Sequence, residues 1–354
     1  MHITGTIDKI VSGSHLTRDE ARAVMQLLLS GSVGDEHIVA FLAALRDKGE
    51  HPNELVGFAE VMREHAAETL LAAGGRIERT ARDEPLLDTC GTGGDALGTF
   101  NVSTAAALVA AAGGVRVGKH GNRSISSRCG SADVLEALGV RIELPPERIA
   151  ECLDTVGCVF LYAPQHHAAT RHVMNARRAM RTKTVFNLLG PLTNPLGATV
   201  QLTGVFDHAR TEIMAEALAR LGTHRAMVVA AWDGMDEVST TGTTRVSEAT
   251  AGTVTTRELS PEDFGLPRGS AASIEGGDAV TNAQILMQVF GGASEPYEPY
   301  RDAVLVNTSA ALVAAGRAQS LPEGVTLSEE AIRSGAAART LARLVEFTQR
   351  SAGR

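Results

Sequence analysis

The chain has 354 residues, of which 44% are hydrophobic and 21% are charged, a balance typical of a globular enzyme with a large core. Its net charge of −8 at pH 7 argues against a protein that binds nucleic acid non-specifically, because such a protein needs an excess of positive charge. No signal peptide and no run of about 18 apolar residues is found, so we predict a cytoplasmic protein that does not enter a membrane.

Residues 1–80 are predicted to contain helices only. A capping box at Thr17 and Glu20 begins the first of them, which ends at Gly31. Two more amphipathic helices are expected over 35–48 and 52–73. Their apolar faces need a cover, which the rest of the chain or a second subunit must supply.

From about residue 85, short apolar segments alternate with helical ones. This pattern predicts an α/β fold in which helices flank a mainly parallel central sheet. The expected strands are 85–88, 115–118, 158–162, 201–206 and 226–230, and the helices between them are 102–112, 132–138, 147–156 and 211–221. A hairpin is expected within 242–258, and helices are expected at 278–290, 301–315 and 328–349.

The polar segment 166–183, rich in His and Arg, interrupts this alternation. We expect it to form one helix that returns to pack on the N-terminal helices. The chain would then divide into a small helical domain, 1–80 with 166–195, and a larger α/β domain, 81–165 with 196–354.

Two glycine-containing loops carry most of the functional signal. The first, GTGGD at 91–95, follows an apolar strand and leads to a helix that begins near Asn101. The second, KHGNRS at 119–124, places two cations beside a glycine. Free backbone N–H groups and the positive end of a helix bind anions, most often phosphates. Either loop alone could be an ordinary turn, but together they predict a ligand with more than one phosphate group.

The four cysteines form no CxxC pair and no zinc-binding spacing, which indicates reduced thiols. Cys90 and Cys129 lie beside the two loops. They are either reactive or, as is commoner for a small apolar side chain, simply buried.

Several short strings extend the two loops into a longer pattern: DTCGTGGD at 88–95, FNVST at 100–104, KHGNRSISS at 119–127, GSADVLEALG at 130–139, APQHH at 163–167, VFNLLGPLTNP at 185–195 and DGMDE at 233–237. With these strings the chain resembles the anthranilate phosphoribosyltransferases over essentially its full length. The resemblance implies transfer of the phosphoribosyl group from phosphoribosyl pyrophosphate (PRPP) to the amine of anthranilate, in tryptophan biosynthesis.

The resemblance also implies which residues bind the donor. The first loop would hold the diphosphate and its magnesium, and the second would wrap the remaining phosphate and the ribose. The residues implied for PRPP are Gly91, Gly94, Asp95, Thr99, Asn101, Val102, Ser103, Thr104, Lys119, His120, Gly121, Asn122, Arg123, Ser124, Ile125, Ser126, Ser127 and Ser131.

Asp236 and Glu237 are implied as metal ligands, completed by the Ser103 hydroxyl. Magnesium prefers oxygen ligands and bridges phosphates, so two carboxylates and a hydroxyl suit it. Adjacent residues of an extended chain point to opposite sides. We therefore expect either an irregular loop at these two acids or two separate Mg²⁺ ions, with two ions per subunit implied by the family.

Anthranilate is implied to contact Arg177, Asn122 and Gly91, since a guanidinium suits an aromatic carboxylate. His120 and His167 are candidates for positioning a reactant or moving a proton. No strong base is required before attack, because an aniline nitrogen is neutral at pH 7. Around Arg177 the chain departs from the family pattern, at 174–176 and 179–181, which bears on selectivity for the acceptor.

Two other functions compete with this prediction. A pyrimidine nucleoside phosphorylase would share the fold and the glycine loop, but not KHGNR followed by SADVLEALG, nor the DGMDE acids. A relative that binds nucleic acid or a partner and has lost transferase activity would have a basic surface. The family also implies a homodimer through the helical domain.

Overall fold

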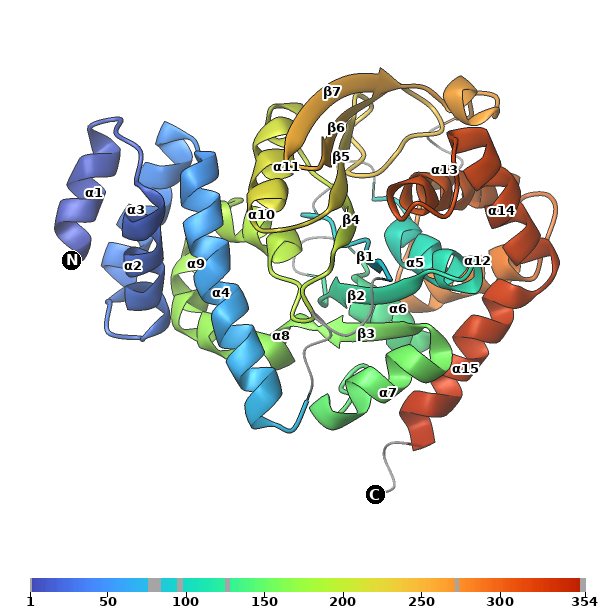
Figure 1. Ribbon diagram of the computed structural model, residues 1–354, viewed down its shortest axis with the longest axis horizontal. Helices are drawn as coiled ribbons and strands as arrows, with labels where there is room; N and C mark the ends of the chain where they lie inside the picture. The colour runs from blue at the N-terminus through green and yellow to red at the C-terminus, as the bar shows by residue number, and fades with distance from the viewer. Residues whose placement is uncertain (1, 76–83, 94–97, 125–127, 271–273, 351–354) are drawn as a thin grey trace.

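The computed structural model describes residues 2–75, 84–93, 98–124, 128–270 and 274–350, and the observations below concern those residues. The chain begins with helices α1 (Ile3–Val11), α2 (Arg18–Leu29), α3 (Asp35–Lys48) and α4 (Pro52–Ala72), which lie together at one side of the molecule (Figure 1). The three predicted helices are confirmed, and α1 is an addition. The capping box of α2 is also confirmed, since Thr17 Oγ1 accepts the Glu20 N–H and a Glu20 oxygen accepts the Thr17 N–H.

The described part of the chain contains one seven-stranded sheet with the order β3-β2-β1-β4-β5-β6-β7. Strands β1 to β5 run parallel, and β6 and β7 form an antiparallel hairpin on β5. The strands are β1 (Leu86–Asp88), β2 (Arg116–Gly121), β3 (Cys158–Tyr162), β4 (Val200–Gly204), β5 (Arg225–Ala231), β6 (Thr244–Thr250) and β7 (Thr253–Leu259). The predicted fold class, the five strands and the hairpin are thus confirmed.

Strand β2 continues three residues beyond its predicted end. Strand β2 was expected to end at Gly118, but it continues to Gly121 because each of its last residues pairs with β3, up to Tyr162. Lys119 and His120 therefore lie on a strand and not in a loop, and their backbone is held by the sheet.

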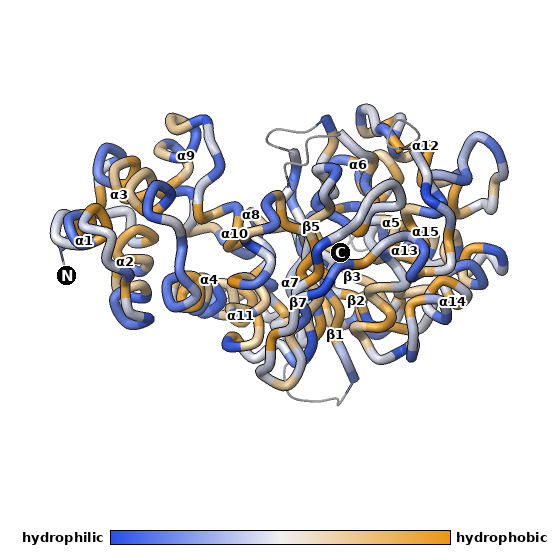
Figure 2. Tube along the Cα trace, turned by 90° about the horizontal axis from the view of Figure 1, so that it is seen from above, coloured by the Kyte–Doolittle hydropathy of each residue, from blue (hydrophilic) through white to orange (hydrophobic). Residues whose placement is uncertain are grey.

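Helices cover both faces of the sheet. Strand β5 alternates between two hydrophobic cores: Met227 and Val229 belong to one, and Val228 and Ala230 to the other. The first core includes residues of α5, α7, α13 and α15, whereas the second joins α11 to the N-terminal helices. Figure 2, seen from above, shows the N-terminal helices again beside the strands. These covering helices are α5 (Val102–Ala112), α6 (Ser131–Ala137), α7 (Pro146–Val156), α11 (Thr211–Arg220), α12 (Ala279–Phe290) and α13 (Glu298–Ala314).

The chain between β3 and β4 returns to the N-terminal helices. It forms α8 (Ala163–His166), the 3₁₀ helix η1 (Ala168–Val173), α9 (Met174–Met180) and α10 (Val185–Leu192). The single helix expected over 166–183 is therefore wrong: the backbone leaves the helical region at His167, with ψ 46°, and turns left-handed at Arg181. Val173 and Ala176 share a hydrophobic core with α2, α3 and α4, so the segment packs on the N-terminal helices as predicted. The domain boundaries themselves stay a prediction.

The helix predicted over 328–349 is also wrong, since two helices, α14 (Leu321–Arg333) and α15 (Ala336–Arg350), cover this region. Gly335, with φ +73°, breaks the chain between them, in a conformation that side chains of other residues rarely adopt. Two further 3₁₀ turns are η2 (His208–Arg210) and η3 (Pro261–Phe264). No helix among the described residues combines the length and apolar character needed to cross a bilayer.

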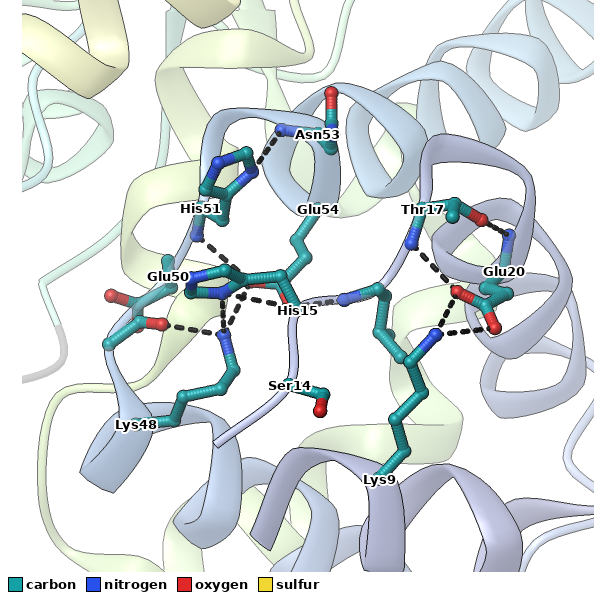
Figure 3. A network of polar contacts seen from close by, with 12 residues as sticks. Lys9, Ser14, His15, Thr17, Glu20, Lys48, Glu50, His51, Asn53 and Glu54 are labelled. Atoms are coloured by element: carbon teal, nitrogen blue, oxygen red, sulfur yellow. Dashed lines mark hydrogen bonds and ion pairs between the residues drawn. The ribbon is translucent and has the colours of Figure 1, made fainter. Parts of the chain in front are cut away.

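A buried ion pair holds the N-terminal helices together (Figure 3). Lys48 at the end of α3 donates to Glu54 Oε2 at 2.9 Å, and their side chains are 5% and 0% exposed. Glu54 also accepts the N–H groups of Leu16 at 2.9 Å and His51 at 2.8 Å, so one carboxylate joins the α1–α2 connection to the start of α4. His15 Nδ1 lies 2.8 Å from Lys48 Nζ. Burial, and then the nearby Lys48 charge, lower the pKa of His15.

Glu54→Ala is expected to destabilise the protein by roughly 3–5 kcal/mol, because it leaves the Lys48 charge buried without its partner. Urea unfolding followed by circular dichroism measures this. Glu64→Ala is the control: it removes an exposed contact with Arg22 and should cost at most about 1 kcal/mol. Equal effects of the two substitutions would contradict a special role for the buried pair.

Candidate functional site

A cavity of about 580 Å³ lies at the carboxyl ends of the parallel strands. All five of these strands end at the same edge of the sheet, the usual place for a ligand in an α/β fold. Each delivers residues to the cavity: 89–93 after β1, 119–124 at the end of β2, 163–164 after β3, Gly204 at the end of β4 and 236–237 after β5. Residues of η1, α9 and α10 form the opposite wall.

Most of the residues predicted from the sequence line this one cavity. They are Gly91, Thr99, Asn101, Ser103, Lys119, His120, Gly121, Asn122, Arg123, Ser124, Ser131, His167, Arg177, Asp236 and Glu237. The side chains of Val102 and Thr104 are instead buried in the first turn of α5 and do not line it. Gly94, Asp95, Ile125, Ser126 and Ser127 lie outside the described residues.

The N-terminus of α5 faces the cavity without a side-chain cap of its own. Its N-cap residue, Asn101, makes no capping bond, because its side chain bonds Asn282 and the Cys129 carbonyl. The next residue but one, Ser103, lines the cavity. The positive end of the helix dipole is thus available to an anion.

Lys119 supplies a fixed positive charge next to this helix start. The side chain is only 4% exposed, and its Nζ donates to the Thr89 carbonyl and hydroxyl, both at 3.2 Å, with Ser103 Oγ at 3.5 Å. Below it, the fully buried Asp88 accepts the His120 N–H and the Asn194 amide. Burial raises the pKa of Asp88 to about 6, while Lys119 and these hydrogen bonds oppose the rise. Among the described residues, Lys119 donates its hydrogen bonds to hydroxyl and carbonyl oxygens, while the Asp88 carboxyl lies close enough to interact with its charge.

Arg123, the second predicted cation of this loop, has a different environment. It lies at the rim, 45% exposed, and pairs with Asp133 and Glu136 of α6. A phosphate would have to compete with these two carboxylates for its guanidinium. Lys119 is therefore the better preorganised cation.

The two candidate histidines are buried and neutral. Their rings are 5.2 Å apart, and His120 Nδ1 lies 3.2 Å from the Gly190 carbonyl, which can only accept, so Nδ1 carries the proton. Burial lowers the pKa of His120 well below its usual value, and lowers those of His166 and His167 to about 4. His120 Nε2 is left as a buried acceptor with no protein partner among the described residues.

Arg177 on α9 is one of three cations on the opposite wall, together with Arg171 and Lys183. Its guanidinium lies over the Phe186 ring, 5.1 Å from the centroid, and Nη1 contacts the Met174 sulfur at 3.7 Å. Burial alone lowers its pKa, with no opposing contribution from a carboxylate among the described residues. By contrast, Arg178 and Arg181 are exposed and do not line the cavity. Arg177 is thus a partly buried cation beside an aromatic ring, with a cavity in front of it.

Asp236 and Glu237 lie in an irregular loop after β5, one of the two arrangements expected from the sequence. Asp236 is only 9% exposed. A Cβ at Gly91 would lie 3.4 Å from Asp236 Oδ2, so the first glycine loop passes directly beside this carboxylate. Ser103 lines the same cavity. The donors are all oxygen atoms, which fits Mg²⁺ and not a metal that prefers sulfur or nitrogen.

The cysteines near the loops are buried thiols. Burial and then the Asp88 charge raise the pKa of Cys90 strongly, and burial raises that of Cys129 to about 11. Neither is therefore a thiolate at neutral pH, and the reactive alternative loses its support.

Several residues of the site were not found from the sequence, and two of them, Gly204 and Asn307, contact the loop of the two acids. Gly204 ends an ordinary strand, and no local pattern marks it. Asn307 lies in the middle of α13, where the run Asn307-Thr308-Ser309 within an otherwise apolar helix was a signal that could have been used.

Residues 83–338 match the family described as the a/b domain of a glycosyl transferase family, and residues 5–66 match its helical bundle domain. The chain is 47% identical over 343 residues to the anthranilate phosphoribosyltransferase of Moorella thermoacetica, covering 97% of each chain. It is 48% identical to that of Rubrobacter xylanophilus, over 98% of this chain and 97% of the relative.

Solved structures give the same result. The enzyme of Thermus thermophilus superposes with a TM-score of 0.87 at 44% identity, covering 97% of this chain and 99% of that one. The Saccharomyces cerevisiae enzyme in complex with PRPP and Mg superposes with a TM-score of 0.85 at 26% identity, covering 98% of each chain.

The buried histidines predict a loss of stability in mild acid. His167 has a folded pKa of about 4, below its unfolded value of about 6.5, so the unfolded chain binds more protons between these pH values. The contribution of His167 to the free energy of unfolding is therefore fully present above pH 6.5, and it falls by about 2 kcal/mol between pH 7 and pH 5. Urea unfolding at both pH values should show a smaller acid loss in His167→Gln than in the wild type. His65→Gln, at an exposed histidine, should leave the loss unchanged.

Proposed function

This chain belongs to the anthranilate phosphoribosyltransferases of the glycosyl transferase family, and from that premise we propose which of its residues carry the reaction. The protein transfers the 5-phosphoribosyl group from PRPP to the amine of anthranilate, giving N-(5-phosphoribosyl)anthranilate and pyrophosphate, in tryptophan biosynthesis. The observation that carries the assignment of roles is that one cavity holds anion-binding groups on the sheet side and the half-buried cation Arg177, next to an aromatic ring, on the helical side.

The donor occupies the sheet side of the cavity. The first glycine loop, the uncapped start of α5 and Lys119 bind the diphosphate, because backbone N–H groups, a helix dipole and a buried ammonium all favour negative charge. The second loop, from Asn122 to Ser124, with Ser131 of α6, holds the remaining phosphate and the ribose.

Asp236, Glu237 and Ser103 hold Mg²⁺, and we propose two ions per subunit. The supporting observation is the all-oxygen donor set beside the glycine loop, together with the binding of PRPP and Mg by the yeast relative. When bound, Mg²⁺ offsets the charge of the diphosphate and of the departing pyrophosphate. A bound cation also explains how the Asp236 and Glu237 carboxylates can lie close to a negatively charged ligand.

The acceptor occupies the helical side. Arg177 forms an ion pair with the anthranilate carboxylate, since no ion pair with a described residue occupies its guanidinium. The Phe186 ring keeps the guanidinium in place. Asn122 and the Gly91 backbone complete this pocket at its border with the donor site. The crystal form of the yeast relative with 4-fluoroanthranilate supports an aromatic acid at this family's site.

The reaction follows from placing the two ligands face to face. The bond from ribose C1 to the pyrophosphate oxygen breaks with its electrons leaving on pyrophosphate, and the neutral amine of anthranilate forms the new bond to C1 from the opposite side. The ammonium so formed then releases one proton to solvent, which leaves the neutral secondary amine of the product. Lys119 and the α5 N-terminus stabilise the negative charge that develops on the leaving group. His120, neutral with Nε2 unprotonated, and His167 position the amine. Orientation and electrostatic stabilisation therefore supply most of the rate.

We propose that the protein is a cytoplasmic homodimer that associates through its helical part. Val11 on α1 is 71% exposed and Leu71 on α4 is 54% exposed, which leaves apolar surface on these helices. Static light scattering at micromolar concentration should give twice the chain mass of 37.1 kDa, and a stable monomer would contradict this assembly.

Arg177→Ala is expected to lower kcat/KM for anthranilate by on the order of 100-fold, because the acceptor carboxylate loses a desolvated charge partner. The loss of anthranilate fluorescence on mixing with PRPP and Mg²⁺ measures the rate. Binding of PRPP should be unchanged. The neighbouring exposed arginine gives a matched control, and Arg178→Ala should behave like the wild type. A wild-type KM for anthranilate in Arg177→Ala would refute this role.

Asp236→Asn is expected to raise the Mg²⁺ concentration for half-maximal rate by roughly 10- to 100-fold, since it removes a charged ligand while keeping the shape of the side chain. The same fluorescence assay over a Mg²⁺ titration measures it. Glu262→Gln, at an exposed acid on η3, is the control. An unchanged Mg²⁺ requirement in Asp236→Asn would remove this residue from the metal site.

A further inference from the structure

The loop that carries Asp236 and Glu237 is held by one side chain from a distant helix. Asn307 of α13 is 1% exposed. Its Oδ1 accepts the Val238 N–H at 2.9 Å, and its Nδ2 donates to the carbonyls of Val238 and Ala303, both at 2.9 Å. The amide thus pairs with both backbone groups of one residue, as a neighbouring strand would, and that residue directly follows Glu237.

The other side of the loop rests on Gly204. A Cβ built there would overlap the Asp236 carbonyl oxygen and lie 2.5 Å from its carbon, so only glycine allows this approach. The Gly204 carbonyl also accepts the Thr92 N–H at 2.8 Å. The acid loop is therefore confined between Asn307 on one side and, on the other, the strand end that also supports the first glycine loop.

Local contacts within the loop do not replace this support. Asp233 accepts the hydroxyl of Ser239 at 2.5 Å, the hydroxyl of Thr241 and the N–H of Met235 at 3.3 Å. These bonds tie together residues before and after the acids. On one side of the two acids, the Asp236 backbone packs against Gly204. On the other side, Asn307 holds the backbone of Val238, which directly follows Glu237.

We propose that Asn307 is a positioning residue of this enzyme, which preorganises Asp236 and Glu237 for the metal. The inference rests on the proposed metal role of these two acids. Mg²⁺ demands near-octahedral geometry, so a loop that must be ordered on binding costs conformational entropy and weakens affinity. Residues that orient metal ligands through hydrogen bonds, without contacting the metal themselves, raise metal affinity in this way.

Asn307→Leu tests the proposal, because it keeps a similar volume and removes both sets of hydrogen bonds. Asn307→Asp is the second variant: it keeps the acceptor for the Val238 N–H but loses the donor and places a charge beside two carbonyls. Ser309→Ala is the matched control, since it removes a buried hydrogen bond from the same helix to the Leu321 carbonyl, far from the loop in sequence. Thermal unfolding verifies that each variant is folded.

Two measurements are made on each protein. Hydrogen–deuterium exchange of peptides covering residues 234–241, in enzyme without metal, reports the order of the loop independently of activity. Calorimetric titration with Mn²⁺ in the presence of PRPP reports metal affinity. We expect faster exchange and an affinity lower by on the order of tenfold in both Asn307→Leu and Asn307→Asp, and wild-type values in Ser309→Ala.

The outcomes separate this inference from the proposed metal site. Weak metal binding in Asp236→Asn, with wild-type affinity and exchange in folded Asn307→Leu, would overturn the role of Asn307 and leave the metal site intact. Wild-type metal affinity in Asp236→Asn would remove the metal site itself, and with it the premise of the proposal. Equal effects in Ser309→Ala and Asn307→Leu would show a general weakening of α13 and also overturn the proposal.

Discussion

The close approach of Gly204 to the Asp236 backbone sets how the charged parts of the site meet. Gly204 ends β4, accepts a hydrogen bond from Thr92 in the first glycine loop, and leaves no room for a side chain beneath the acid loop. Two segments separated by more than a hundred residues are therefore held in contact through the end of one strand. A larger residue at Gly204 would push the backbone of Asp236, and with it the carboxylates, away from the first glycine loop.

Burial gives the cavity its electrostatic character. Lys119 contacts hydroxyls and carbonyls, the histidines are neutral because burial disfavours their charged forms, and Arg177 faces sulfur and an aromatic ring. Charges that are poorly solvated interact more strongly with a ligand than the same charges in water. Buried or half-buried cations therefore lie on both walls of the cavity, Lys119 on one and Arg177 on the other.

The helical part does more than cover the sheet, because it carries the wall of the cavity that includes Arg177. Arg63 of α4 donates to the carbonyls of Leu192 at 2.6 Å and Leu221 at 3.0 Å, which joins α4 to the ends of α10 and α11. The core of these helices continues onto one face of β5. The position of Arg177 relative to Lys119 is consequently determined by packing across this junction, and movement there would change the distance between acceptor and donor.

The sequence by itself determined the fold class, the five parallel strands, the hairpin and a set of site residues, most of which line the cavity. Apolar periodicity and glycine positions are local properties, and the strings around Gly91, Lys119 and Asp236 are specific enough to identify a family. Only the tertiary structure decided where β2 ends, since pairing with β3 extends it through His120. It also decided how the segment around Arg177 breaks into short helices, and that Gly204 and Asn307 support the acid loop. These features depend on contacts between residues far apart in the chain. Gly204 is required because the Asp236 backbone lies against it, and Asn307 is required because it pairs with the peptide groups of Val238. No local sequence pattern reveals either contact.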